Sequence, residues 1–109
     1  MSGLAVAAEA KKYINKSSQY DCFEFVNFIY KKVAGINDLK RGFSCMLVAG
    51  TQVTKELKPG DLIVQKVNWN LGIYIGNDTM VLAPRNRGDI PRITNLPNYS
   101  YEVRRIVNK

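Results

Sequence analysis

One of the two cysteines in this 109-residue chain stands where it could act as a nucleophile. Cys22 follows Asp21 at the start of an amphipathic stretch. The partial positive charge at the N-terminus of a helix stabilises a thiolate and lowers the thiol pKa from its free value of about 8.5. The competing interpretation is a buried structural cysteine. A thiolate nucleophile commonly works with a histidine base, and the chain contains no histidine.

Neither the second cysteine nor the glycines indicate a bound cofactor. Cys45 has no cysteine or histidine partner at the spacing of metal ligands, so a zinc site is not supported. The glycines do not form a phosphate-binding loop. We therefore predict no metal and no nucleotide cofactor, and two thiols in a chain of this size do not make a disulfide framework.

The residues that follow Cys22 predict the helix that would position it. Apolar side chains recur from Cys22 to Val33 at the spacing of one helical face. Asp21 suits the N-cap because its carboxylate can accept a hydrogen bond from an unpaired backbone N–H of the first turn. Gly35 suits the other end because glycine readily adopts a positive φ.

Two further helices are expected, one on each side of this helix. The Ala-rich stretch from Leu4 to Ile14 contains no helix breaker and predicts a helix that ends near Asn15 or Lys16. A short helix is indicated over Ser44 to Ala49.

Beyond residue 60 the pattern changes from helical to extended. Short segments rich in β-branched or aromatic residues predict four strands: Leu62 to Val67, Leu71 to Ile75, Thr79 to Ala83 and Tyr101 to Val107. The segment from Pro84 to Ser100, with three prolines, is expected to be a long loop that shapes a cleft. Helices first and strands second predict an α+β fold, with the N-terminal helices packed on a small antiparallel meander.

Size and composition indicate one domain over residues 1–109. A chain with 46% hydrophobic residues can supply a single core. Its apolar runs fall far short of the roughly 18 residues of a membrane span, and Glu9, Lys11 and Lys12 stand where a signal peptide would be apolar. We expect neither a span nor a standard export signal, which fits a cytoplasmic protein, a phage component or export by another route.

The charge balance favours an anionic partner. Sixteen Lys and Arg against nine Asp and Glu give a net charge of +7, and residues 84–109 hold six of these cations. The partner could be a nucleic acid, an acidic membrane face or a cell-wall polymer, since charge alone does not fix its identity. A solubilising surface explains the charge equally well.

Several segments occur together in a characteristic order and spacing. They are Tyr20-Asp21-Cys22 before the amphipathic stretch, Ala49 to Val53, Leu57 to Ile63, Leu71 to Gly76, and Val81 to Pro84. This arrangement is similar to that of the NlpC-type peptidoglycan endopeptidases of the papain-like superfamily, over more than half of the chain. The resemblance implies a papain-like NlpC-type fold and a cell-wall peptide as partner.

The resemblance also assigns the catalytic positions. In that family a cysteine in an Asp-Cys-Ser-Gly motif is the nucleophile, a histidine before the Val-Gly-Ile-Tyr strand is the base, and a polar residue on the next strand orients the base. These positions correspond to Cys22, Asn70 and Leu82, while Phe23-Glu24 replaces Ser-Gly. An amide cannot take a proton near neutral pH and Leu82 has no polar atom, so the family mechanism is expected to fail here.

Four further residues are candidates for contact with a substrate. The family often carries a tyrosine upstream of its nucleophile, so Tyr13 and Tyr20 are candidates, as is Asp21 beside the cysteine. Trp69, next to the base position, could stack on a sugar or a peptide. The plainer interpretation of a lone tryptophan in a small domain is a core residue.

Three hypotheses remain open from the sequence. The first is a degenerate NlpC-like domain that binds cell-wall peptide or a protein partner without hydrolysing it. The second is an active peptidoglycan peptidase that uses Cys22 and whose histidine has been replaced; Lys66 and Glu24 are the nearest substitute bases, and neither stands at the required position. The third is a basic nucleic-acid-binding module, for which no recognised motif is present.

Overall fold

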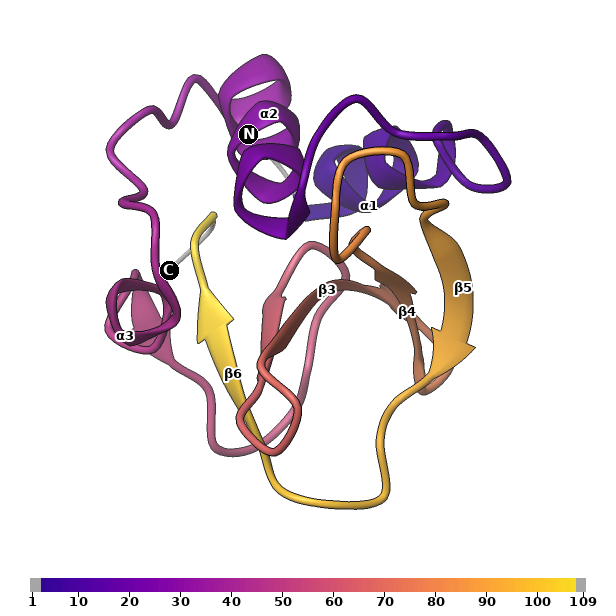
Figure 1. Ribbon diagram of the computed structural model, residues 1–109. Coiled ribbons are helices and arrows are strands. Elements are labelled where there is room, and N and C mark those ends of the chain that lie inside the picture. Colours follow the sequence, from indigo (N-terminus) through magenta and orange to yellow (C-terminus); the bar gives the residue numbers. More distant parts are fainter. Residues whose placement is uncertain (1–2, 108–109) are drawn as a thin grey trace.

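The computed structural model describes residues 3–107 as three helices and a single antiparallel sheet (Figure 1). The helices are α1 (Gly3–Lys11), α2 (Cys22–Ala34) and α3 (Phe43–Met46). The strands are β1 (Thr51–Gln52), β2 (Leu62–Gln65), β3 (Asn70–Gly76), β4 (Thr79–Leu82), β5 (Arg92–Asn95) and β6 (Tyr101–Arg105). They lie side by side in the order β1-β6-β2-β3-β4-β5.

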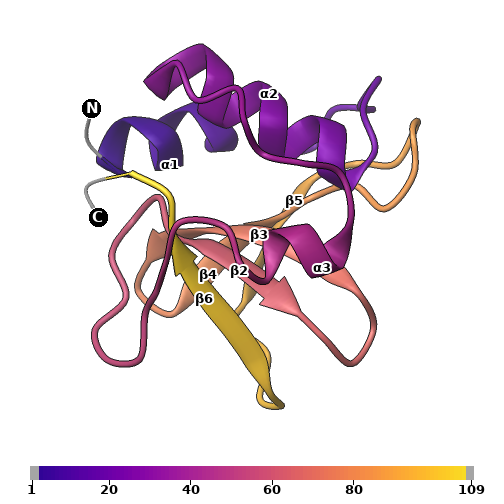
Figure 2. The same ribbon diagram turned by 90° about the vertical axis from the view of Figure 1, so that its left-hand side faces the viewer.

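Helices α1 and α2 cover one face of this sheet, as Figures 1 and 2 show. The apolar face of α2 contributes Phe25, Val26 and Ile29 to the main core, where they meet Leu71 and Ile73 of β3. Side chains alternate between the two faces of a strand, so the neighbouring residues of the same strands build a second, smaller cluster. That cluster contains Ile63, Tyr74, Met80 and Val103.

Both ends of α2 have the predicted caps. Asp21 is the N-cap, and its side chain accepts a hydrogen bond from the Glu24 backbone N–H. Gly35 ends the helix with φ 69°, and its N–H bonds to the carbonyl of Lys31. The α+β fold and helices on an antiparallel sheet are confirmed.

The predicted end of the first helix was wrong. The helix stops at Lys11, and a turn follows in which Asn15 has φ 63°. The backbone N–H of Asn15 donates instead to the carbonyl of Pro91, 3.0 Å away. A tertiary contact thus replaces the last helical turn. The short helix α3 begins one residue earlier than predicted, at Phe43, and ends sooner.

The sheet has two strands more than the four that were predicted. β1 lies shortly after the short helix, and β5 lies within the segment expected to be a long loop. The simple meander was also wrong: β2 to β5 follow one another, but β6 returns to pair with the free side of β2. Among the described residues, no helix is long and apolar enough to cross a membrane.

Candidate functional site

Cys22 is the first residue of α2 and lies against the core. Its side chain is 4% exposed and belongs to the main apolar cluster. Burial, followed by the negative charge of Asp21, raises the pKa of the Cys22 thiol. Hydrogen bonds from backbone N–H groups of the first turn lower this pKa, but by less than burial and the Asp21 charge raise it. Desolvation is thus the stronger effect on this thiol, which favours the competing interpretation of a buried cysteine.

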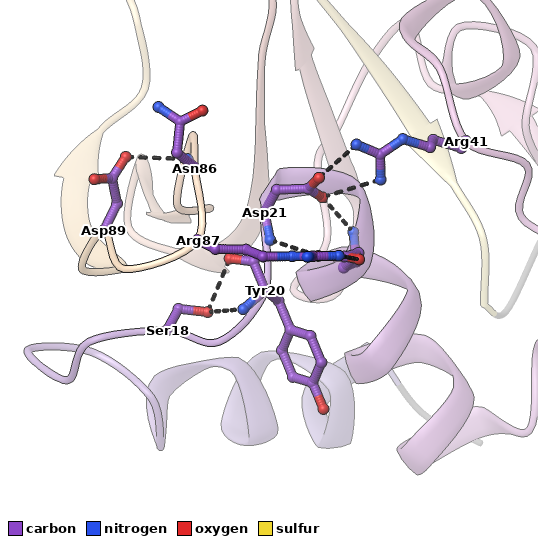
Figure 3. A network of polar contacts seen from close by, with 8 residues as sticks. Ser18, Tyr20, Asp21, Arg41, Asn86, Arg87 and Asp89 are labelled. Carbon is purple, nitrogen blue, oxygen red and sulfur yellow. Dashed lines mark hydrogen bonds and ion pairs between the residues drawn. The ribbon is translucent and has the colours of Figure 1, made fainter.

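Two arginines from separate segments hold the first turn of α2 (Figure 3). Arg41, before α3, forms an ion pair with Asp21. Arg87, from the β4–β5 segment, donates from Nε to Glu24 Oε1 at 2.9 Å and forms an ion pair with the same carboxylate. Asp21 and Glu24 also close a capping box, each side chain accepting from the other's backbone N–H at 3.0 Å. Cys22 is thus fixed in a turn whose two carboxylates are both neutralised.

These contacts decide what Glu24 can do chemically. The hydrogen bond from Arg87, reinforced by the Asp21 backbone, lowers the pKa of Glu24 from its ordinary 4.5 to about 2. A carboxylate with so low a pKa is a very weak base near neutral pH. Glu24 is therefore unsuited to replace the missing histidine.

Asn70, at the predicted base position, is the first residue of β3 and is only 8% exposed. Its Oδ1 accepts a hydrogen bond from the Leu71 backbone N–H at 3.2 Å. Asn70 and Leu82 line one open cavity of about 420 Å³, whose wall includes Arg85, Asp89 and Arg92. The predicted base and orienting positions thus lie at one cavity, and Cys22 is not among the described residues that line it.

The β4–β5 segment that forms one wall of this cavity is anchored to the α1–α2 connection. Gly88 N–H donates to the Ser18 carbonyl at 2.6 Å, and Ser18 N–H donates to the Asp89 carbonyl at 2.9 Å. Gly88 has φ 96°, a conformation that a side chain would strain. The segment expected to be a loop beside the cleft is therefore held by backbone hydrogen bonds.

Tyr13 and Tyr20 do not line the cavity beside Asn70. They lie with Phe25 and Phe28 around a separate cavity of about 270 Å³. Tyr20 stacks on Phe28 with ring centroids 5.0 Å apart, and the Tyr13 hydroxyl donates to Glu9 Oε2 at 2.7 Å. Both tyrosines therefore have structural partners at a distinct place on the molecule.

Trp69 is 46% exposed, so the interpretation of this residue as part of the core was wrong. Its ring lies 5.1 Å from that of Phe43, which lies 4.7 Å from that of Phe23. The Arg41 guanidinium covers Phe23 at 4.9 Å. This aromatic row joins the residue after Cys22 to the residue before Asn70.

Sequence reasoning missed the arginines around the site. Arg41, Arg87 and Arg92 come from segments that meet only in the folded chain. The one local signal was Glu24, three residues after Asp21, which is the spacing of a capping box.

The sequence and fold were compared with known proteins. The pattern of the NlpC/P60 family matches residues 11–106. Over 90 residues the chain is 36% identical to a gamma-DL-glutamyl hydrolase of Bacillus subtilis, which covers 81% of this chain and 21% of that protein. Over 69 residues it is 35% identical to a probable endopeptidase NlpC homolog of Haemophilus influenzae, covering 62% of this chain and 37% of that protein. The chain thus spans less than two fifths of either relative.

Solved structures show the same fold. The NlpC/p60 domain of the peptidoglycan hydrolase SagA superposes with a TM-score of 0.75 at 24% identity, covering 94% of this chain and 98% of that one. NlpC2 from Trichomonas vaginalis superposes with a TM-score of 0.74 at 21% identity, covering 98% of this chain and 47% of that one. With the family pattern matching most of its length, this chain belongs to the NlpC/P60 family.

Proposed function

We propose that this NlpC/P60 domain binds cell-wall peptides through its cleft and hydrolyses them poorly or not at all. The similarity to a peptidoglycan hydrolase domain and to a probable endopeptidase supports the class of ligand. The replacement of the catalytic base supports the loss of turnover.

The observation that carries this proposal is the chemistry at Asn70. An amide side chain occupies the family's base position, and its Oδ1 is engaged by the Leu71 N–H. Leu82 next to it offers no polar atom. Loss of a positioned general base costs about 10²–10⁴ in rate.

Three nearby ionisable groups are poorly suited to act as the base in place of a histidine. Glu24 is committed to Arg87, and Lys66 is an exposed residue just beyond β2. Asp89 is the carboxylate in the wall of the Asn70 cavity, and its Oδ2 already accepts from the Asn86 N–H at 3.0 Å. The raised pKa of Cys22 further reduces the thiolate available at neutral pH.

Binding and cleavage should be measured on the same samples to test this proposal. Purified peptidoglycan peptides would be titrated into the protein by calorimetry, and the recovered peptides would be analysed by mass spectrometry. We expect saturable binding with no new peptide fragments. The Asp89→Asn variant should likewise produce no peptide fragments.

Either of two results would overturn the proposal. If none of the peptides bound, cell-wall peptides would be ruled out as ligands. Fragments that form with the unaltered chain and disappear in Cys22→Ala would show a working peptidase, and their further loss in Asp89→Asn would identify the substitute base.

A further inference from the structure

We propose that the cavity beside Asn70 binds a carboxylate group of a peptide ligand, and that the Asn70 amide is one of the groups that hold it. This inference rests on the proposed function, because it assigns a ligand chemistry to the same cleft. It gives the residue at the base position a binding role in place of a catalytic one.

The orientation of the Asn70 amide follows from its one described partner. The Leu71 backbone N–H can only donate, so the Asn70 atom that meets it must be the oxygen. The amide nitrogen Nδ2 accordingly points elsewhere. None of the residues 3–107 accepts a hydrogen bond from it, although Asn70 is more than nine-tenths buried.

This nitrogen reaches the molecular surface. No side-chain nitrogen or oxygen among the described residues is both fully buried and without a hydrogen-bond partner. Nδ2 must therefore reach solvent, and Asn70 contributes to the surface of the 420 Å³ cavity. A buried amide that keeps two free N–H donors at the edge of a cavity is suited to a ligand with acceptor atoms.

The strand register places an arginine on the same side of the sheet. Asn70 and Gly72 lie two residues apart on β3 and so share a face. Gly72 is paired with Leu82 of β4, and Leu82 is paired with Arg92 of β5. Gly72, Leu82 and Arg92 thus form a row across three strands, and Asn70 lies on the same face two residues along β3. Asn70, Leu82 and Arg92 all line the cavity.

The charges around the cavity favour a single anionic group. Arg85 and Arg92 supply two guanidinium groups, and Asp89 supplies one carboxylate, which leaves one net positive charge. Arg85 donates from one nitrogen to the Asn68 carbonyl at 2.8 Å and keeps its other donors. Planar guanidinium and amide donors match the two oxygens of a carboxylate.

The remaining wall is apolar and suits the peptide that carries this group. Leu82, Pro84 and Ile90 line it, and Ile90 is 41% exposed. The volume falls within the range of about 300–1,000 Å³ that is typical of small-ligand sites. The carboxylate could belong to the C-terminus of a peptide or to a γ-linked glutamyl residue within it, and the test separates these sources.

The first experiment probes the cavity itself with sodium acetate. The side-chain amide signal of Asn70 would be followed by ¹H–¹⁵N NMR and assigned by its absence in Asn70→Leu. We expect acetate to shift this signal saturably in the unaltered chain, and sodium chloride at equal ionic strength to leave it in place. Arg92→Gln should weaken the acetate response at least about tenfold, since a charge-assisted hydrogen bond is lost.

Lys31→Gln is the matched control, because it removes one positive charge from an exposed residue near the other end of α2. It should leave the acetate response unchanged. Equal loss in Lys31→Gln and Arg92→Gln would indicate general charge attraction and overturn the proposal. An Asn70 signal that acetate does not move, or that inorganic phosphate moves more strongly, would overturn it as well.

The second experiment uses a γ-glutamyl tripeptide with all carboxyl groups free and two derivatives, each amidated at one carboxyl. We expect amidation at the recognised carboxyl to weaken binding about tenfold or more in the unaltered chain, and by much less in Arg92→Gln. Equal binding of all three forms would overturn the carboxylate assignment and leave the proposed function standing. An acetate response without binding of any peptide would uphold the site and contradict the proposed function.

Discussion

At Cys22, burial and the helix N-terminus act on the thiol in opposite directions. The side chain is 4% exposed, and its desolvation together with the Asp21 charge outweighs the backbone N–H groups of the first turn. Burial in apolar surroundings raises a thiol pKa and can outweigh the effect of a helix N-terminus. Arg41 is near enough to lower the pKa of Cys22, but it is paired with Asp21.

Thiol alkylation should reveal this difference between the two cysteines. Because Cys22 is buried with a raised pKa, we expect iodoacetamide at pH 7 to modify it more slowly than the half-buried Cys45. The rate at Cys22 should rise steadily with pH. Mass spectrometry of the digested protein measures both rates, and a Cys22 that reacts first at pH 7 would contradict the raised pKa.

Glu9 makes stability depend on pH. A hydrogen bond from Tyr13, with the nearby Lys12 and Lys32, lowers the pKa of Glu9 from its ordinary 4.5 to about 2. The folded state therefore binds this proton less readily than the unfolded state. The resulting stabilisation is present above pH 4.5 and is lost as the pH falls through about 2.

The Glu9→Gln variant isolates this contribution. We expect the variant to be less stable than the unaltered chain by about 1–3 kcal/mol at pH 7, because a charge-assisted hydrogen bond is weakened. The difference should shrink as the pH is lowered from 5 towards 2. Urea denaturation at several pH values measures it, and a constant difference would refute the assignment to Glu9.

At the scale of elements, α2 was predictable because its information is local. Its apolar spacing, Asp21 at the N-cap and Gly35 at the C-cap all belong to one short stretch of sequence. β5 was missed because Pro91 and Pro97 flank it and its residues are largely polar, as in a loop, and its pairing with β4 forms only in the folded chain. The end of α1 was missed for a similar reason, since Asn15 bonds to Pro91 across the molecule.

The N-cap of α2 should carry measurable stability. Asp21→Ala removes the side-chain bond to the Glu24 N–H and the ion pair with Arg41. We expect a loss of about 1–2 kcal/mol in the free energy of unfolding, as for other N-cap replacements. Urea denaturation checks this, with the exposed Asp38→Ala as a control that should change by less than about 0.5 kcal/mol.

The candidate site was predictable in part, because some of its residues belong to short local stretches of sequence. Cys22, Asn70 and Leu82 were predicted from the resemblance of short segments to the family, and the structure places Asn70 and Leu82 at one cavity. The arginines that surround them come from loops whose positions depend on long-range contacts. Their roles could not be inferred before the fold was known.

At the scale of the whole molecule, much of the positive charge is used internally. Arg104 donates to the carbonyls of Ala49 and Gly50, and Arg105 forms an ion pair with the buried Asp61. Arg87 is held by Glu24. Because these arginines are paired within the molecule, they are less available to bind a nucleic acid along the C-terminal segment.

A buried hydroxyl joins the helical layer to the sheet. Tyr30 of α2 is fully buried and donates to the Gly60 carbonyl at 2.6 Å, just before β2. Tyr30→Phe would leave that carbonyl without its partner, at a cost of about 1–3 kcal/mol. We expect this loss in urea denaturation. Tyr99→Phe, at an exposed hydroxyl, should change stability by less than about 0.5 kcal/mol.

The most direct test of the central claim is to restore the base. Purified muropeptides would be incubated with the unaltered chain, with Asn70→His and with Asn70→His/Cys22→Ala, and the products followed by mass spectrometry. We predict cleavage by Asn70→His alone, because it combines a base with Cys22 on the same scaffold. Cleavage by the unaltered chain at a rate similar to that of Asn70→His would contradict the claim that Asn70 leaves this peptidase fold without a working base.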